Sequence, residues 1–126
     1  MARRTPHQQA ITQVITDAPG PLSADEVRNR LRDTGVGVAT VYRALKAGVE
    51  SGVFQPVDIP HSPTRYEPAS RPHHHHFQCD ACDCVYDLPG CPGDLDRLLP
   101  QGFSLDRHDI LLHGICETCQ PTKEAA

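Results

Sequence analysis

Apolar and polar positions in the first half of the chain follow the period of a helix three times. In residues 5–18 the apolar side chains recur every three or four positions, the spacing of a short helix with one buried face. A capping box of Ser23 and Glu26 predicts the start of a second helix. The same one-sided pattern predicts a third helix over residues 39–51.

The pattern then changes to that of strands. Residues 53–57 and 64–67 predict two strands joined by a proline-rich loop. Three helices followed by such a hairpin predict a winged helix-turn-helix domain over residues 1–68. Residues 69–72 are typical of a hinge, and the abrupt change to histidine and cysteine predicts a second domain over residues 73–126.

The second domain combines strands with a short helix. Residues 77–79 and 85–88 predict the two arms of a hairpin, residues 94–99 a short helix, and residues 103–112 a further strand. The expected fold class is therefore α+β, an N-terminal winged helix followed by a small α/β domain.

Composition makes a bound metal a structural expectation. The chain has 126 residues and no tryptophan, and aromatic residues make up only 5%, so we do not expect either half to form a self-sufficient hydrophobic core. No apolar stretch approaches the length of a membrane span, which predicts no membrane partner. The six cysteines follow no secretory leader, so we expect a reducing compartment, the cytoplasm.

The net charge of −4 at first argues against a nucleic-acid partner. Its distribution weakens this objection, because residues 1–68 carry 8 basic and 7 acidic side chains, whereas residues 69–126 carry 4 and 9. The acidity therefore belongs to the second domain.

Four cysteines form the strongest chemical signal. Two C-x-x-C pairs, a spacing that lets two thiolates bind one ion, are formed by Cys79, Cys82, Cys116 and Cys119. Four thiolates in tetrahedral geometry suit Zn²⁺, and because they fill every position, the sequence predicts a structural zinc. A redox-labile disulfide and an iron–sulfur cluster are the alternatives.

Cys84 and Cys91 lie outside this pattern. We interpret them as small, buried or half-exposed side chains. A redox or auxiliary metal role is the other interpretation, since Cys91 lies near the histidine ligands expected in this domain.

Residues 73–76 form an uninterrupted run of histidines. On an extended segment alternate side chains point to opposite faces, so we expect His73 and His75 on one side and His74 and His76 on the other. One run could thus serve two metal sites, each completed by carboxylates or imidazoles from elsewhere. A solvated run without function and a purification tag are the competing interpretations.

Two further histidines lie downstream. His113 is interpreted as structural. His108 is expected in a strand of the same small domain with acidic neighbours, and we interpret it as a metal ligand.

Residues 40–45 begin the predicted third helix. In a winged helix this helix enters the major groove, where Thr40 and Arg43 can contact phosphate and Tyr42 can reach base edges or a thymine methyl group. The alternative is that Tyr42 and Arg43 only cover the core.

Together these motifs resemble the ferric uptake regulator (Fur) family over roughly residues 5–120. The order and spacing of several segments carry the resemblance: residues 39–45, Arg65-Tyr66-Glu67, residues 73–82, Gly102-Phe103, His108 and residues 114–119. The resemblance implies a homodimer whose winged helices bind a palindromic operator in double-stranded DNA. It also implies dimerisation of the second domains through a mixed sheet, and DNA binding that requires a regulatory divalent metal.

The resemblance further implies two regulatory sites. The site at the hinge corresponds to Glu67, His74 and His76. The site in the dimerisation domain corresponds to His73, His75 and His108 with a carboxylate, for which Asp94 or Asp96 is best placed.

Departures from the family pattern leave the sensed metal open. Iron-type members carry a histidine where this chain has Pro21, and zinc-type members carry an aspartate and a cysteine near the positions of Gln55 and Ala69. Peroxide-sensing members use a carboxylate that corresponds to Asp87, together with the missing histidine. Zn²⁺, Fe²⁺ and Mn²⁺ all stay candidates, with His61 near the wing tip as a substitute ligand.

The sequence therefore predicts a metal-dependent repressor that controls metal homeostasis, with a structural Zn²⁺ and a second divalent metal as cofactors. A peroxide-sensing regulator of the same family is one alternative. A zinc-ribbon metal carrier without specific DNA binding is another, and it would leave the winged helix unexplained. We expect no enzyme, because the motifs of zinc proteases and deaminases are missing.

Overall fold

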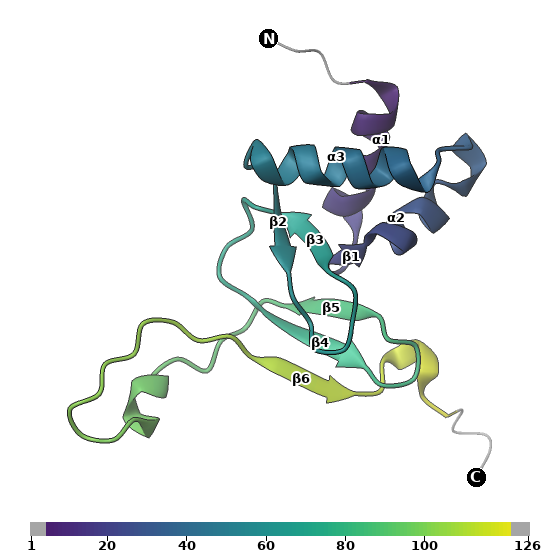
Figure 1. Ribbon diagram of the computed structural model, residues 1–126. Helices are drawn as coiled ribbons and strands as arrows, with labels where there is room; N and C mark the ends of the chain where they lie inside the picture. Colours follow the sequence, from purple (N-terminus) through teal and green to yellow (C-terminus); the bar gives the residue numbers. More distant parts are fainter. Residues whose placement is uncertain (1–4, 122–126) are drawn as a thin grey trace. The chain divides into compact units, whose positions relative to one another are not determined.

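The computed structural model describes residues 5–121 and divides the chain into two compact units, Met1–Pro72 and His73–Ala126 (Figure 1). Each unit contains a three-stranded sheet of its own. The predicted α+β fold class is confirmed, with a winged helix in the first unit and a small mixed domain in the second.

Three helices form most of the first unit: α1 (Pro6–Asp17), α2 (Ala24–Arg30) and α3 (Val38–Glu50), with the 3₁₀ turn η1 (Arg32–Thr34) after α2. The predicted capping box is confirmed, because the Ser23 hydroxyl accepts from the Glu26 amide and the Glu26 carboxylate accepts from the Ser23 amide. Gly35, at a φ of 73°, ends η1 in the left-handed conformation that glycine adopts without strain.

The sheet of the first unit contains β1 (Leu22–Ser23), β2 (Phe54–Val57) and β3 (Arg65–Pro68) in the order β1-β3-β2, all antiparallel. The predicted hairpin corresponds to β2 and β3. The sequence did not predict β1, because two residues are too short to show an alternating pattern.

The first unit buries one continuous apolar core between its helices and sheet, so the expectation that neither half forms such a core is wrong for this unit, where aliphatic side chains take the place of aromatic ones. Its fully buried side chains include Ile11, Val27, Val41 and Leu45. Gly48 on α3 lies directly against the Phe54 ring, and a Cβ at this glycine would come within 2.2 Å of a ring carbon. The helix and the first wing strand therefore pack closely only because residue 48 is glycine.

A partly buried ion pair links the wing to the second helix. Arg65 on β3 is 4% exposed and pairs with Glu26, the residue that also caps α2. Arg65 also donates to the Pro21 carbonyl at 3.2 Å. These contacts fix the wing against the start of α2, and thereby hold the helices in the arrangement that presents α3.

The second unit contains β4 (His75–Cys79), β5 (Val85–Leu88) and β6 (Leu111–Gly114), with 3₁₀ turns η2 (Leu95–Leu98) and η3 (Glu117–Cys119). The strand order is β5-β4-β6, with β4 antiparallel to β5 and parallel to β6. The predicted hairpin around the first cysteine pair is confirmed, and the predicted short helix is the 3₁₀ turn η2.

The predicted strand over residues 103–112 is wrong in most of its length. Residues 103–110 form no strand, and β6 begins only at Leu111. The register explains this, because β4 begins at His75 and pairs His76 with Leu111, so residues further upstream have no strand beside them. His108 consequently lies in an irregular segment and not in a strand.

Within residues 5–121, no helix combines the length and the apolar character that crossing a membrane requires.

Candidate metal centres

The four-cysteine cluster forms at one end of the second sheet. Because β4 and β6 are parallel and Cys79 pairs with Gly114, the two C-x-x-C segments leave the sheet side by side. The sulfurs of Cys79, Cys82, Cys116 and Cys119 all lie within 4.8 Å of one another. The Cys82 and Cys116 sulfurs are 3.8 Å apart, and a tetrahedral ion with Zn–S bonds of about 2.3 Å sets its sulfurs about 3.8 Å apart. The cluster therefore fits a four-thiolate zinc.

Backbone and side-chain donors prepare two of these thiols to lose their protons. The Cys116 amide lowers the pKa of Cys79 to about 6, and the Ala81 amide assists; each lies 3.4 Å from the sulfur. The Tyr86 hydroxyl is the main cause that lowers the pKa of Cys116. Thiolates are the form that binds zinc, so these donors favour metal binding at Cys79 and Cys116. In the other two ligands, burial raises the pKa of Cys82 and a hydrogen bond with Cys116 raises the pKa of Cys119.

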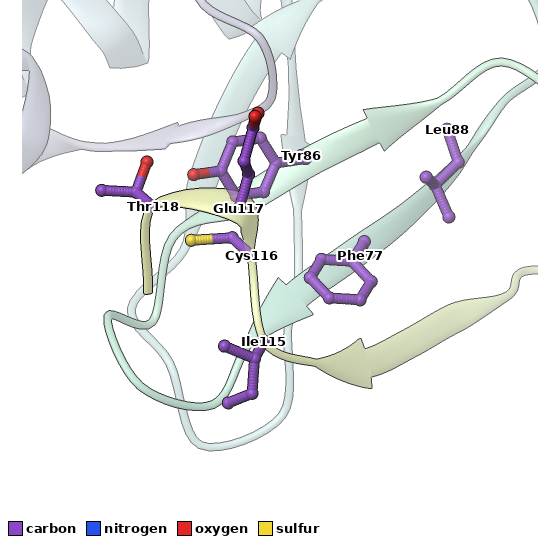
Figure 2. A pocket seen from close by; sticks show the side chains of 7 residues that line it. All are labelled: Phe77, Tyr86, Leu88, Ile115, Cys116, Glu117 and Thr118. Carbon is purple, nitrogen blue, oxygen red and sulfur yellow. The ribbon is translucent and has the colours of Figure 1, made fainter. Parts of the chain in front are cut away.

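Tyr86 lies in the wall of a cavity of about 350 Å³ that borders the cluster (Figure 2). The cavity is lined by Phe77, Tyr86, Leu88, Ile115, Cys116, Glu117 and Thr118. Donation to the Cys116 sulfur raises the pKa of Tyr86 to about 12. The Tyr86 hydroxyl is thus a permanent donor that stabilises one of the four thiolates.

Replacing Tyr86 with phenylalanine is expected to weaken zinc binding at the four-cysteine cluster about tenfold, since groups that hydrogen-bond to metal ligands commonly contribute ten- to a hundredfold in affinity. Competition with a chromophoric zinc chelator measures the change. Tyr66→Phe, on β3 of the first unit, serves as the control and should keep the affinity of the unmodified protein. Equal affinities for both variants would show that the hydroxyl does not support the cluster.

The alternation predicted for the histidine run is confirmed. His74 and His76 form one group with Asp87, the residue that β5 places opposite His76. Each of the two imidazole Nε2 atoms lies 3.5 Å from the Asp87 Oδ1 atom. Two imidazoles and one carboxylate that converge on one point are a donor set that suits a divalent metal.

The other face of the run forms a second group with residues from two distant segments. His73, His75, His108 and Cys91 have donor atoms that all lie within 4.8 Å of one another. His108 Nε2 is 3.3 Å from His73 Nε2 and 3.1 Å from the Cys91 sulfur.

The two aspartates considered for that second group lie elsewhere. Among the residues that the structure describes, the group includes neither Asp94 nor Asp96, both of which are exposed. Cys91 stands where the sequence analysis expected a carboxylate.

His75 is the buried member of this second group, with 3% of its surface exposed. Burial, and then the charge of His73, lower its pKa and keep the ring neutral. Its Nδ1 accepts from the Ile110 amide at 3.2 Å, and its Nε2 has no hydrogen-bond partner in the described part of the chain. Nε2 binds metal only in the tautomer protonated at Nδ1, so metal binding there replaces the Ile110 hydrogen bond.

The remaining predicted residues lie in the first unit. Glu67 is on β3 opposite Gln55, whose side-chain amide donates to the Glu67 carboxylate. Tyr42 and Arg43 are exposed on α3, where the Arg43 guanidinium donates to the Thr40 hydroxyl at 3.1 Å. These positions leave the α3 side chains available for an external partner.

The sequence pattern of the ferric uptake regulator family matches residues 1–110, most of the chain. This protein belongs to that family. The fold and the groups of cysteines and histidines described above are thus those of a Fur-family regulator.

Known Fur-family proteins resemble the chain along most of its length. A ferric uptake regulation protein of Synechococcus elongatus is 29% identical over 132 residues, covering 94% of this chain and 86% of the relative. The peroxide operon regulator of Bacillus subtilis is 26% identical, covering 93% and 83%. A solved structure of a zinc-bound manganese uptake regulator has a TM-score of 0.77 at 23% identity, covers 91% of each chain, and shows the shared fold. Because their names refer to iron, peroxide and manganese, family membership leaves the metal of this Fur protein open.

In this Fur-family member, α3 is amphipathic: one face packs into the core and the opposite face is exposed, as in a helix that contacts DNA. Val41 and Leu45 are fully buried, whereas 52% of the Tyr42 surface is exposed. About half of the Tyr42 surface is therefore open to an external partner.

Sequence reasoning missed one residue of these candidate centres and gave a second only as an alternative. Tyr86 donates to a cysteine sulfur across the sheet, and no local motif predicts such a contact. For Cys91, an auxiliary metal role was the second interpretation, after that of a small buried or half-exposed side chain. The sequence did contain a signal for Cys91. This residue lies between two Pro-Gly pairs, which predict a tight turn and not an extended, flexible loop.

Proposed function

We propose that this Fur-family protein is a metal-dependent repressor that binds a palindromic operator in double-stranded DNA as a homodimer and controls metal homeostasis. The observation that carries the proposal is one chain with an exposed recognition helix in its first unit and two separate histidine groups in its second. A cytoplasmic location and a hinge at residues 69–72 belong to the same proposal.

The proposed cofactors differ in role. The four cysteines are proposed to hold a structural Zn²⁺, since no ligand position stays open. The histidine groups are proposed to hold regulatory divalent metal, Zn²⁺, Fe²⁺ or Mn²⁺. Glu67, proposed as a further ligand of the His74 and His76 site, rests on the family resemblance alone.

The DNA contacts are proposed to come from α3. Arg43 and Thr40 are positioned to contact phosphate, and Tyr42 to reach base edges in the major groove. Binding of divalent metal by the histidine groups is proposed to favour the dimer in which both α3 helices fit successive major grooves.

Exposed apolar side chains in the second unit support the homodimer. Leu98, Phe103 and Leu112 expose 71%, 69% and 51% of their surfaces. Exposed apolar side chains of this size favour burial against a partner, and we propose that they contribute to the dimer interface. β5 and β6 also form the two edges of the sheet, where a further strand can pair.

A peroxide-sensing regulator is the second candidate. Asp87 joins His74 and His76 in a site of nitrogen and oxygen donors, the donor type that suits Fe²⁺ and Mn²⁺. The relative named as a peroxide operon regulator supports the same alternative. Loss of DNA binding after peroxide treatment of the iron-loaded protein, with no loss for the zinc-loaded protein, would favour this candidate.

Removing the regulatory metal is expected to weaken operator binding about a hundredfold, which corresponds to a coupling of ~3 kcal/mol between metal and DNA. Gel shifts with and without a mild chelator measure the effect. Metal analysis of the same samples must show that one zinc per chain stays bound, so that the four-cysteine site is intact. Equal affinity in both conditions would contradict the metal switch.

A further inference from the structure

Cys91 and three histidines converge at one place in the second unit, although they come from three separate segments. His75 begins β4 and His73 lies two residues before it, whereas Cys91 lies in the loop after β5 and His108 in the segment before β6. We propose that Cys91 is the fourth ligand of this group, and that the resulting site of three imidazoles and one thiolate selects Zn²⁺ over Fe²⁺ and Mn²⁺. The inference rests on the proposed metal-dependent function, and it assigns Zn²⁺ to one of the two proposed regulatory sites.

The distances within the group match those of a tetrahedral zinc site. Zn–N bonds of about 2.0–2.1 Å set two imidazole nitrogens about 3.3–3.4 Å apart, and the Nε2 atoms of His73 and His108 are 3.3 Å apart. A nitrogen and a sulfur are expected about 3.5 Å apart. The Cys91 sulfur and His108 Nε2 are 3.1 Å apart, so a small change in one side-chain torsion completes the geometry.

The backbone around Cys91 restricts where its sulfur can lie. Pro92 follows directly and limits Cys91 to extended conformations. Gly93 and Asp94 then both have positive φ, 66° and 48°, which turns the chain sharply into η2. Because Pro92 already limits the backbone of Cys91, holding this residue at the metal costs less conformational entropy than at an unrestricted position.

No carboxylate competes for the same position. Asp109, although its charge raises the pKa of His75, does not belong to the ligand group among residues 5–121. Asp94 and Asp96 also lie outside it. The described residues thus offer this site one sulfur and three nitrogens, and no oxygen.

This donor set determines the metal preference. A thiolate is a soft ligand that favours Zn²⁺, whereas Mn²⁺ favours oxygen ligands and higher coordination numbers. The group of His74, His76 and Asp87, in the same unit, has no sulfur. The two histidine groups therefore differ in donor chemistry, and only one of them is expected to be specific for zinc.

The test uses the full chain with zinc in the four-cysteine cluster and the histidine sites emptied by a mild chelator. Co²⁺ reports tetrahedral coordination by its visible absorption and a thiolate ligand by a near-ultraviolet charge-transfer band. We expect the band in the unmodified protein and in Cys84→Ser, the control that removes the other cysteine outside the cluster. We expect Cys91→Ser to lose the band, and zinc affinity at this site to fall about a hundredfold, the upper end of what ligand-supporting groups contribute.

A carboxylate in place of the thiolate tests selectivity directly. Cys91→Asp should lower the ratio of Zn²⁺ to Mn²⁺ affinity at least tenfold, because an oxygen ligand replaces sulfur. Alkylation followed by peptide mass spectrometry gives an independent measurement, in which zinc should protect Cys91 and leave the reactivity of Cys84 unchanged. A charge-transfer band and zinc affinity that are unaltered in Cys91→Ser would overturn the inference and reduce the Cys91–His108 contact to a hydrogen bond.

The outcomes separate this inference from the proposed function. If chelator still abolishes operator binding while Cys91→Ser behaves like the unmodified protein, only the ligand role of Cys91 is wrong. If Cys91 binds cobalt while no metal changes DNA affinity, the ligand role holds and the metal-dependent repressor is wrong.

Discussion

Replacing Cys116 with serine is expected to release zinc from the four-cysteine cluster and to unfold the second unit. Among the described residues of this unit, the buried hydrophobic side chains are Cys79, Val85 and Cys116. Two of the three belong to the four-cysteine cluster, so the zinc proposed there would take the place of a hydrophobic core. Structural zinc sites bind with apparent free energies of about 10–16 kcal/mol, which equals or exceeds the whole stability of a typical domain.

The first unit should survive this substitution, because its core forms around α1, α2 and α3 without any cysteine. Circular dichroism should therefore retain most of its helical signal, while metal analysis shows less than one zinc per chain and a protease cleaves the second unit. Cys84→Ser is the matched control, a cysteine of the same unit outside the cluster, and it should keep zinc and protease resistance. A Cys116→Ser protein that retained both would show that the cluster is not structural.

Features that depend on neighbouring residues were predictable from the sequence. The capping box of Ser23 and Glu26 follows from a four-residue rule, and the division of the histidine run follows from the alternation of side chains along a strand. The four-cysteine cluster was predictable for the same reason, since each C-x-x-C pair is a local unit. Only the approach of the two pairs to each other depends on the fold.

Features that depend on pairing between distant segments were not predictable. The start of β6 at Leu111 is set by its register with β4, which residues 103–112 do not encode. Cys91 reaches His108, 17 positions away, because the loop after β5 turns back toward the start of β4. Asp94 and Asp96 lie close to Cys91 along the chain, and each was a candidate for the carboxylate of the family pattern. The turn after Cys91, which the sequence did not predict, places both outside the group.

Replacing Tyr42 and Arg43 with alanine is expected to abolish operator binding while leaving metal binding unchanged. Both side chains are exposed on α3, so their removal opens no cavity in the core. A good base contact contributes about 1–3 kcal/mol, and a dimer loses it at both half-sites. Tyr42→Ala alone should therefore weaken binding between about thirtyfold and twenty-thousandfold, at 1.4 kcal/mol per factor of ten.

The two single variants should differ in how their DNA affinity depends on salt. Arg43→Ala removes one phosphate contact per subunit, so the slope of log affinity against log salt should become shallower by about 2 for the dimer. Tyr42→Ala should leave that slope unchanged and reduce the preference for operator over random DNA. Arg97→Ala, which removes an exposed arginine from η2, is the charge-matched control and should alter neither property. If both variants kept full operator affinity and metal content, the chain would behave as the metal carrier that the sequence left as an alternative, because a carrier has no need of an exposed tyrosine on α3.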